Sequence, residues 1–179
     1  NGGSIEVIIA KNKSRRTSNI NLIKKIKVDE KKITKKAFHN FSERIKKIKN
    51  DLVSFVNKNY PIAGYGASTK GNIVLNYCDL KSSQISYISD AKKQKFEKYT
   101  PGTNIKIISK ERMRALKPKY VLVLIWSFRS EIIKQELNYI KKGGSLVFHL
   151  PKIEKKRSAS LSCKCMMPKK SVNSAPHQE

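Results

Sequence analysis

The clearest hydrophobic pattern lies over residues 33–55, where apolar side chains recur every three or four positions. The stripe consists of Ile33, Ala37, Phe41, Ile45, Ile48, Leu52 and Phe55. Its spacing matches the helical period of roughly 3.6 residues, and lysines occupy the other side. The residue before a proline avoids helical backbone. We therefore expect a long amphipathic helix that ends near Asn57–Asn59, ahead of Pro61.

Short apolar segments alternate with helical ones after this helix. Strand-like runs cover 62–65, 85–89, 105–108, 120–126 and 145–150, with helical spacing over 69–77, 111–116 and 130–142. Strand–helix–strand repetition with short connections is typical of parallel βαβ units. The sequence therefore predicts an α/β fold: a Rossmann-like open, mainly parallel sheet with flanking helices, preceded by the long amphipathic helix. Ligands in such sheets bind beyond the carboxyl ends of the strands, so the turns after Tyr65, Asp90 and Trp126 should share one edge.

The two ends of the chain have a different texture. Residues 4–10 alternate like a strand, and residues 11–28 are polar and basic, which favours a loop with a short extended or helical piece. We place one domain over residues 1–154 and a disordered, basic and Ser-rich tail over 155–179. The chain starts without Met and without a signal-peptide pattern, so we interpret it as part of a longer, cytoplasmic protein. Three cysteines also suit a reducing compartment.

Composition adds a strong positive charge, with 39 Lys+Arg against 13 Asp+Glu and a net charge of +26. This excess suggests nucleic acid as a partner. However, the charge is spread along the whole chain, and 32 of the basic residues are Lys. Arg is favoured where bases and phosphates are recognised, whereas a joint excess of Lys, Ile and Asn also follows from an AT-rich coding sequence. We therefore do not expect nucleic acid as the main partner, and no apolar run is long enough to span a membrane.

The richest chemistry lies between the strand at 62–65 and the helix at 69–77. This turn consists of Gly64, Tyr65, Gly66, Ala67, Ser68, Thr69, Lys70, Gly71 and Asn72. Glycines let the backbone turn sharply and approach a ligand, and a helix amino end attracts anions. Ser68 and Thr69 can cap the helix or donate to a phosphate, and Lys70 adds a positive charge. Together these features predict a phosphate or diphosphate site, with an ordinary glycine turn as the alternative.

Two familiar phosphate motifs do not fit this spacing. A dinucleotide fingerprint would need its third glycine at position 69, which is Thr69. A P-loop needs its lysine after the last glycine, whereas Lys70 precedes Gly71. The turn is therefore not assigned to either motif.

Two further residues should lie on the same edge of the sheet. Asp90 ends the second strand and could bind a ribose hydroxyl, or could simply form a turn or cap a helix. Trp126 ends the central strand and could stack on a base or sugar, or pack in the core. The histidines, His39, His149 and His177, are expected to be structural or exposed, and we find no catalytic or metal-binding set.

The motif residues also resemble a known family. The Gly64–Asn72 string, the segment from Asp90 to Pro101-Gly102-Thr103, and the segment from Pro118 to Trp126 keep its order. They resemble the C-terminal domain of the S-adenosylmethionine (SAM)-dependent sugar C-methyltransferases, over about residues 1–154. One departure is Glu97, which stands where glycine is usual, and a second is Lys92-Lys93 in place of Asn-Pro.

The resemblance implies a division of labour. In this family a zinc-binding N-terminal domain and a SAM-binding central domain precede a C-terminal domain that helps to hold a nucleotide-diphosphate sugar. The partners implied are that sugar and the methyltransferase domain of the same full-length chain. The present chain is expected to bind neither SAM nor zinc. It is also expected to be inactive alone. The substrate-binding residues implied are Gly64, Tyr65, Gly66, Ala67, Ser68, Thr69, Lys70, Gly71, Asn72, Asp90, Pro101, Gly102, Thr103 and Trp126.

Two other functions stay open from the sequence. A basic nucleic-acid-binding module would bind unrelated oligonucleotides with a steep dependence on salt. A stand-alone Rossmann-like NAD(P)-binding domain would bind the dinucleotide, although the missing third glycine argues against it.

Overall fold

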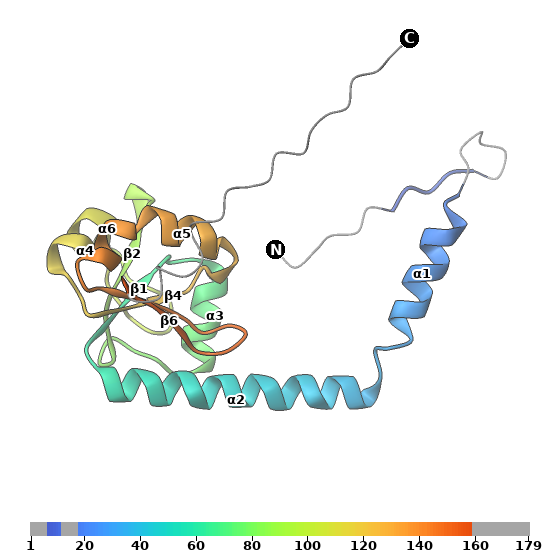
Figure 1. The fold of residues 1–179 in the computed structure, drawn as a ribbon, viewed down its shortest axis with the longest axis horizontal. Coiled ribbons are helices and arrows are strands. Elements are labelled where there is room, and N and C mark those ends of the chain that lie inside the picture. Colours follow the sequence, from blue (N-terminus) through green and yellow to red (C-terminus); the bar gives the residue numbers. More distant parts are fainter. Residues whose placement is uncertain (1–6, 12–17, 159–179) are drawn as a thin grey trace, which may run out of the picture.

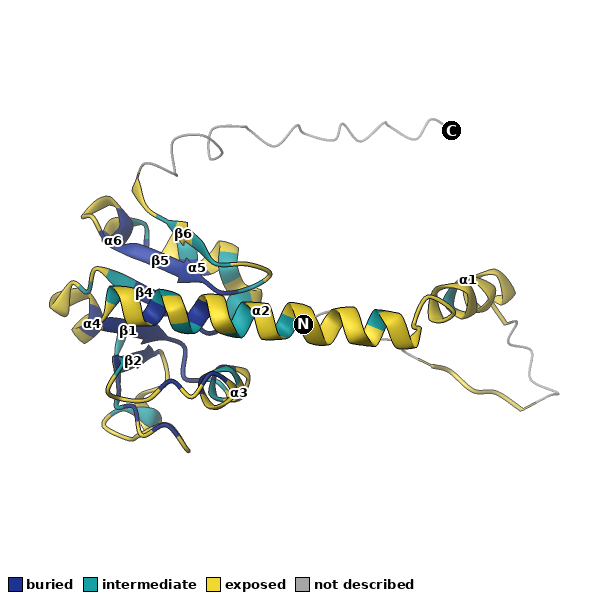
Figure 2. Ribbon diagram, turned by 90° about the horizontal axis from the view of Figure 1, so that it is seen from below, coloured by how far each residue is buried: buried dark blue, intermediate teal, exposed yellow. Residues whose placement is uncertain are grey.

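Two helices precede the sheet in the computed structural model, which describes residues 7–11 and 18–158. They are α1 (Ile20–Glu30) and α2 (Lys35–Asn59), the second of which is the predicted amphipathic helix. Thr34 caps α2 by accepting a hydrogen bond of 3.2 Å from the Ala37 amide, and the helix ends before Pro61. Only its carboxyl-terminal part, with Leu52 and Val56, is buried, and the first half extends beyond the domain (Figures 1 and 2).

The sheet contains six strands, five of which are parallel. They are β1 (Ile62–Tyr65), β2 (Ile85–Asp90), β3 (Ile107–Ser109), β4 (Tyr120–Val123), β5 (Ser145–Phe148) and β6 (Glu154–Lys156). The order is β3-β2-β1-β4-β5-β6, and only β6 runs antiparallel to its neighbour. An order that reverses at β1 and β4 is that of a doubly wound Rossmann sheet, so the predicted fold is confirmed.

Helices cover both faces of the sheet. One face packs against α2 and α3 (Thr69–Tyr77) through a core that includes Leu52, Leu75 and Leu124. The other face packs against α4 (Lys110–Leu116), α5 (Arg129–Gln135) and α6 (Leu137–Lys141), with Met113 and Phe148 in its core. Two single 3₁₀ turns, Lys93–Lys95 and Trp126–Phe128, follow β2 and β4.

The structure corrects the prediction for the amino-terminal segment. Residues 7–10, the described part of the strand expected over 4–10, have no regular structure, and the short helical piece expected within 11–28 is α1, which continues to Glu30. Asn19 starts α1 by accepting a hydrogen bond of 3.0 Å from the Leu22 amide. No residue of α1 is buried, so its apolar side chains do not pack into the core of the domain. The exposed apolar side chains of α1, the following connection and the first half of α2 are Ile20, Leu22, Ile23, Val28, Ile33, Phe38 and Phe41.

Two element boundaries also differ from the prediction. The helix expected over 130–142 is divided into α5 and α6 at Glu136, whose backbone (φ −104°, ψ 19°) departs from helical values. The domain boundary placed at residue 154 falls inside β6, whose Lys155 and Lys156 pair with Val147 and Leu146. The disordered tail that we predicted lies, from residue 159 onward, outside the described residues.

Glu136 departs from helical backbone where its side chain joins a buried ion pair. Its carboxylate has no exposed surface and accepts two hydrogen bonds from Arg114, of 2.7 and 2.8 Å. The Tyr65 hydroxyl donates a third, of 3.0 Å, to the same carboxylate. These contacts join β1, α4 and the α5–α6 junction beneath the sheet.

Candidate functional site

The turn after β1 requires glycine for two physical reasons. Gly66 has φ +89°, in the left-handed region that L-residues avoid. A Cβ atom there would also lie 2.7 Å from Cγ1 of Ile125, which follows β4. The Gly66 amide donates to the Ser89 carbonyl over 2.7 Å. The turn is therefore pressed between the ends of β2 and β4, at the carboxyl edge of the sheet.

Ser68 caps the helix that follows, as the sequence predicts. Its Oγ accepts a hydrogen bond of 3.0 Å from the Gly71 amide. Gly71 allows α3 to approach the sheet closely, because a Cβ there would lie 2.9 Å from the Cβ of Leu124. Thr69 and Lys70, at the amino end of α3, are exposed to solvent. An exposed helix amino end with an adjacent lysine is a suitable place for an anion.

Asp90 braces the turn from the neighbouring strand. Its Oδ2 accepts hydrogen bonds from the Ala67 amide (2.9 Å) and from Lys95 Nζ (3.1 Å), and its Oδ1 accepts one from the Lys92 amide (2.8 Å). Lys95 Nζ also donates to the Ala67 carbonyl over 2.6 Å. Because both carboxylate oxygens already accept protein hydrogen bonds, these contacts favour the turn-forming alternative for Asp90. Its contact with a ribose hydroxyl stays a prediction.

The Tyr65 side chain points away from the turn to which its backbone belongs. It is fully buried on the face of α4 to α6, where its hydroxyl bonds to Glu136. Burial and the neighbouring carboxylate raise the pKa of this phenol. Only the backbone of Tyr65 therefore belongs to the turn, together with the buried Gly64 and Ala67.

The Pro101-Gly102-Thr103 segment lies away from the β1–α3 turn. Its Pro101 carbonyl accepts a hydrogen bond of 3.3 Å from Asn76 Nδ2, at the carboxyl-terminal end of α3. Thr103 is buried, and its hydroxyl lies 2.7 Å from that of Thr100. Asn76 lies seven residues after Thr69, about two helical turns along α3, so these three residues lie away from the amino end of the helix.

In the loop before Pro101, Glu97 has the left-handed backbone conformation that glycine usually adopts. Glu97 has φ +63°, in the left-handed region, which agrees with the glycine that we expect there from the family resemblance. Its carboxylate pairs with Lys106 (2.6 Å) and Arg112 (3.2 Å). These contacts lower the pKa of Glu97, first through the hydrogen bond from Lys106.

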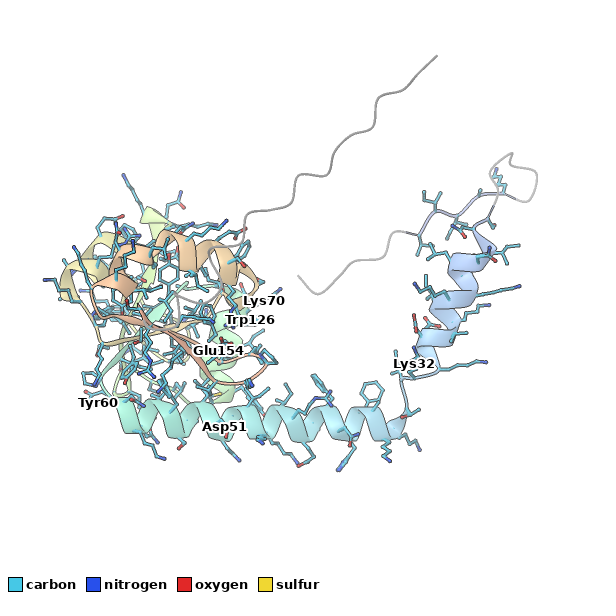
Figure 3. The ribbon with its side chains drawn as sticks, viewed as in Figure 1. Lys32, Asp51, Tyr60, Lys70, Trp126 and Glu154 are labelled. Atoms are coloured by element: carbon cyan, nitrogen blue, oxygen red, sulfur yellow. The ribbon has the colours of Figure 1, made fainter. Side chains whose placement is uncertain are left out.

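Trp126 meets the turn at the carboxyl edge, as predicted. It follows Ile125, which touches Gly66, and Figure 3 shows it at the same end of the domain as Lys70. Its ring stands edge-on to His149, with ring centroids 5.1 Å apart and an angle of 82°. The edge therefore unites Gly66, Ser68, Lys70 and Trp126 from β1–α3 and β4–α5.

His149 is the rim residue that the sequence prediction missed. It directly follows β5, is only 1% exposed, and neither ring nitrogen forms a hydrogen bond of ordinary geometry within the described residues. Burial lowers the pKa of His149 to about 4, and a hydrogen-bond contact with the Val123 backbone, outside ordinary hydrogen-bond geometry, opposes this in part. Its position one residue beyond the last parallel strand was the signal available in the sequence.

One well-formed hollow of the domain lies at the opposite edge of the sheet. A cavity of about 490 Å³ is lined by residues such as Tyr60, Pro61, Pro118 and Tyr120, at the amino ends of β1 and β4. Figure 3 shows Tyr60 at the other end of the domain from Lys70 and Trp126. A wider hollow of about 580 Å³ lies between α2 and the segment at residues 152–155. The cavity at Tyr60 lies at an edge without the helix amino ends that attract an anion. We therefore place the candidate site at the carboxyl edge, as an open surface.

The described residues exclude two features: a metal-ligand cluster and a membrane-spanning helix. No three His, Cys, Asp or Glu side chains of residues 7–11 and 18–158 come together as a metal site would need. Within the same residues, no helix combines the length and the apolarity that crossing a membrane requires. Cys163 and Cys165 lie outside these residues.

Comparison with known proteins identifies the family. The profile of a family described as the C-methyltransferase C-terminal domain matches residues 1–151, and the chain belongs to this family. The C-methyltransferase NovU of Streptomyces niveus is 38% identical over 90 residues, which are 50% of this chain and 21% of that protein. The match thus spans about a fifth of the relative's length.

Proposed function

We propose that this chain is the nucleotide-diphosphate-sugar-binding part of a SAM-dependent sugar C-methyltransferase. The observation that carries the proposal is the β1–α3 turn, where Gly66 and Gly71 bring the backbone close to β4 and leave the amino end of α3 exposed. Backbone N–H dipoles and Lys70 together favour a diphosphate at this point. Trp126 provides an aromatic wall beside it for a base or sugar ring.

The chemical step belongs to other parts of such an enzyme. SAM would supply the methyl group when bound to a central domain, and zinc would sit in an amino-terminal domain. Neither group is assigned to residues of this chain, where the described part contains no metal-ligand cluster. This domain would hold and orient the acceptor sugar, and would not transfer the methyl group alone.

The exposed apolar face of α1 and the first half of α2 suggests how the domains meet. Phe38 is 64% exposed and Phe41 is 54% exposed, although both lie on an ordered helix. Contiguous exposed apolar surface marks interaction sites. In a longer C-methyltransferase chain, this face would contact the methyltransferase domain and set its distance from the bound sugar.

Isothermal titration with thymidine-diphosphate glucose tests the binding role. We expect the unaltered chain to bind and Lys70→Ala to bind about tenfold more weakly, since it loses a charge next to the diphosphate. Lys47→Ala is the matched control, because it removes an equal charge from the exposed side of α2. No binding by the unaltered chain, or equal losses in both variants, contradicts the proposal.

A further inference from the structure

Three buried side-chain atoms near the carboxyl edge form no hydrogen bond of ordinary geometry within the described residues, although the Val123 backbone lies near the His149 ring. They are Nδ1 and Nε2 of His149 and Oδ1 of Asn72. Buried polar atoms are nearly always paired, because an unpaired one costs about 1–3 kcal/mol. These atoms therefore point to a ligand group that completes them.

Strand alternation places His149 on the same side of the sheet as α3. Val147 belongs to the core under α2 and α3, and Phe148 to the core on the other face. Side chains alternate along a strand, so His149 follows Val147 to the α3 side. Leu124 is on that side too, and it is the residue that Gly71 of α3 contacts.

The site consequently has two chemically different ends. Lys70 and the amino end of α3 make its outer end positive. Against the sheet, the neutral imidazole of His149 offers one donor and one acceptor. Asn72 Oδ1, in the first turn of α3 on the same face of the sheet, offers a further acceptor. Hydroxyl groups can both donate and accept, so they satisfy such a set, whereas a phosphate cannot donate to its acceptors. The Trp126 ring lies over His149 and keeps this end partly apolar.

We propose that His149 and Asn72 bind hydroxyl groups of the sugar, while the diphosphate lies at Lys70. This inference rests on the proposed function and adds the direction of the ligand: the sugar lies inward against β5, and the anion lies outward at α3. His149 thereby acts as a sugar-recognition residue.

Comparing two ligands tests this direction. The affinities of thymidine diphosphate and of thymidine-diphosphate glucose are measured by titration with the unaltered chain, His149→Phe and Lys70→Ala. We expect His149→Phe to lose about tenfold for the sugar ligand and nothing for the diphosphate, since one to two hydrogen bonds vanish. Lys70→Ala should weaken both ligands by the same factor. His39→Phe, a change on the exposed surface of α2, is the matched control and should leave both affinities unchanged.

The outcomes separate the two proposals. Binding of neither ligand by the unaltered chain overturns the proposed function and this direction together. Normal sugar binding by His149→Phe, or an equal loss for both ligands, overturns only the direction. Thermal unfolding of each variant shows whether it is folded. If a variant does not fold, an NMR titration of the unaltered chain tests the same point. There, the imidazole ¹⁵N signals of His149 should move on addition of the sugar ligand and stay in place with thymidine diphosphate; unmoved signals in both cases contradict the inference.

Discussion

The buried histidine makes a quantitative prediction about stability and pH. Burial lowers the pKa of His149 to about 4 from an ordinary value of 6.5. The unfolded chain therefore takes up this proton first as the pH falls. Stability is complete above about pH 6.5 and is lost progressively down to about pH 4. At about 1.36 kcal/mol per pH unit, the gap between the two pKa values corresponds to at most roughly 3.4 kcal/mol.

Urea unfolding followed by circular dichroism at pH 7, 6, 5 and 4 measures this loss. His149→Phe is the informative variant, because it keeps a ring against Trp126 and removes the titrating group. We expect the unaltered chain to lose about 2–3 kcal/mol more than the variant between pH 7 and pH 4. The exposed carboxylates titrate in both proteins, so their contribution cancels in the difference. Parallel pH profiles would refute the reasoning and show that His149 is accessible to protons in the folded state.

Three further changes test other parts of the structure, each by chemical unfolding. Arg114→Ala should cost about 2–3 kcal/mol, because the buried Glu136 carboxylate loses the half-exposed Arg114 and keeps only Tyr65. Arg114→Met with Glu136→Leu should cost clearly less, and equal costs contradict the ion-pair account. Gly66→Ala should cost about 1–3 kcal/mol through its left-handed backbone and its contact with Ile125, while a change below 0.5 kcal/mol contradicts that requirement for glycine. Glu97→Gly should be about 1 kcal/mol more stable than Glu97→Ala. Both variants lose the exposed ion pairs, but the left-handed backbone at this position is strained for alanine and not for glycine. The reverse order of stability would contradict this reasoning.

Local patterns were sufficient to predict the elements that carry the site. The apolar stripe of α2, the strand at 62–65 and the cap at Ser68 all arise from residues close together in the sequence. The strand predicted over 120–126 is shorter in the structure and ends at Val123. Topology then followed from the alternation of strands and helices, because parallel crossovers allow few arrangements. The position of Lys70 and Trp126 at one edge was predictable for the same reason.

The features that were missed depend on contacts between distant residues. His149 is an ordinary polar residue in a strand-like sequence, and its burial exists only because Trp126 and the α3 side of the sheet cover it. Glu136 lies in a continuous helical pattern, and its buried ion pair joins residues 22 positions apart. The first helix was expected only as a short extended or helical piece within a loop, because lysines interrupt its apolar positions.

The central claim is that a nucleotide-diphosphate sugar binds at the β1–α3 turn. The most direct test is a ¹H–¹⁵N titration of the chain with thymidine-diphosphate glucose, which reports on every backbone amide at once. The account predicts that the largest shifts fall on Gly66 to Asn72 and on Trp126 and His149. Shifts concentrated around the cavity of about 490 Å³ at Tyr60, Pro61 and Tyr120, or no shifts at millimolar ligand, would contradict it.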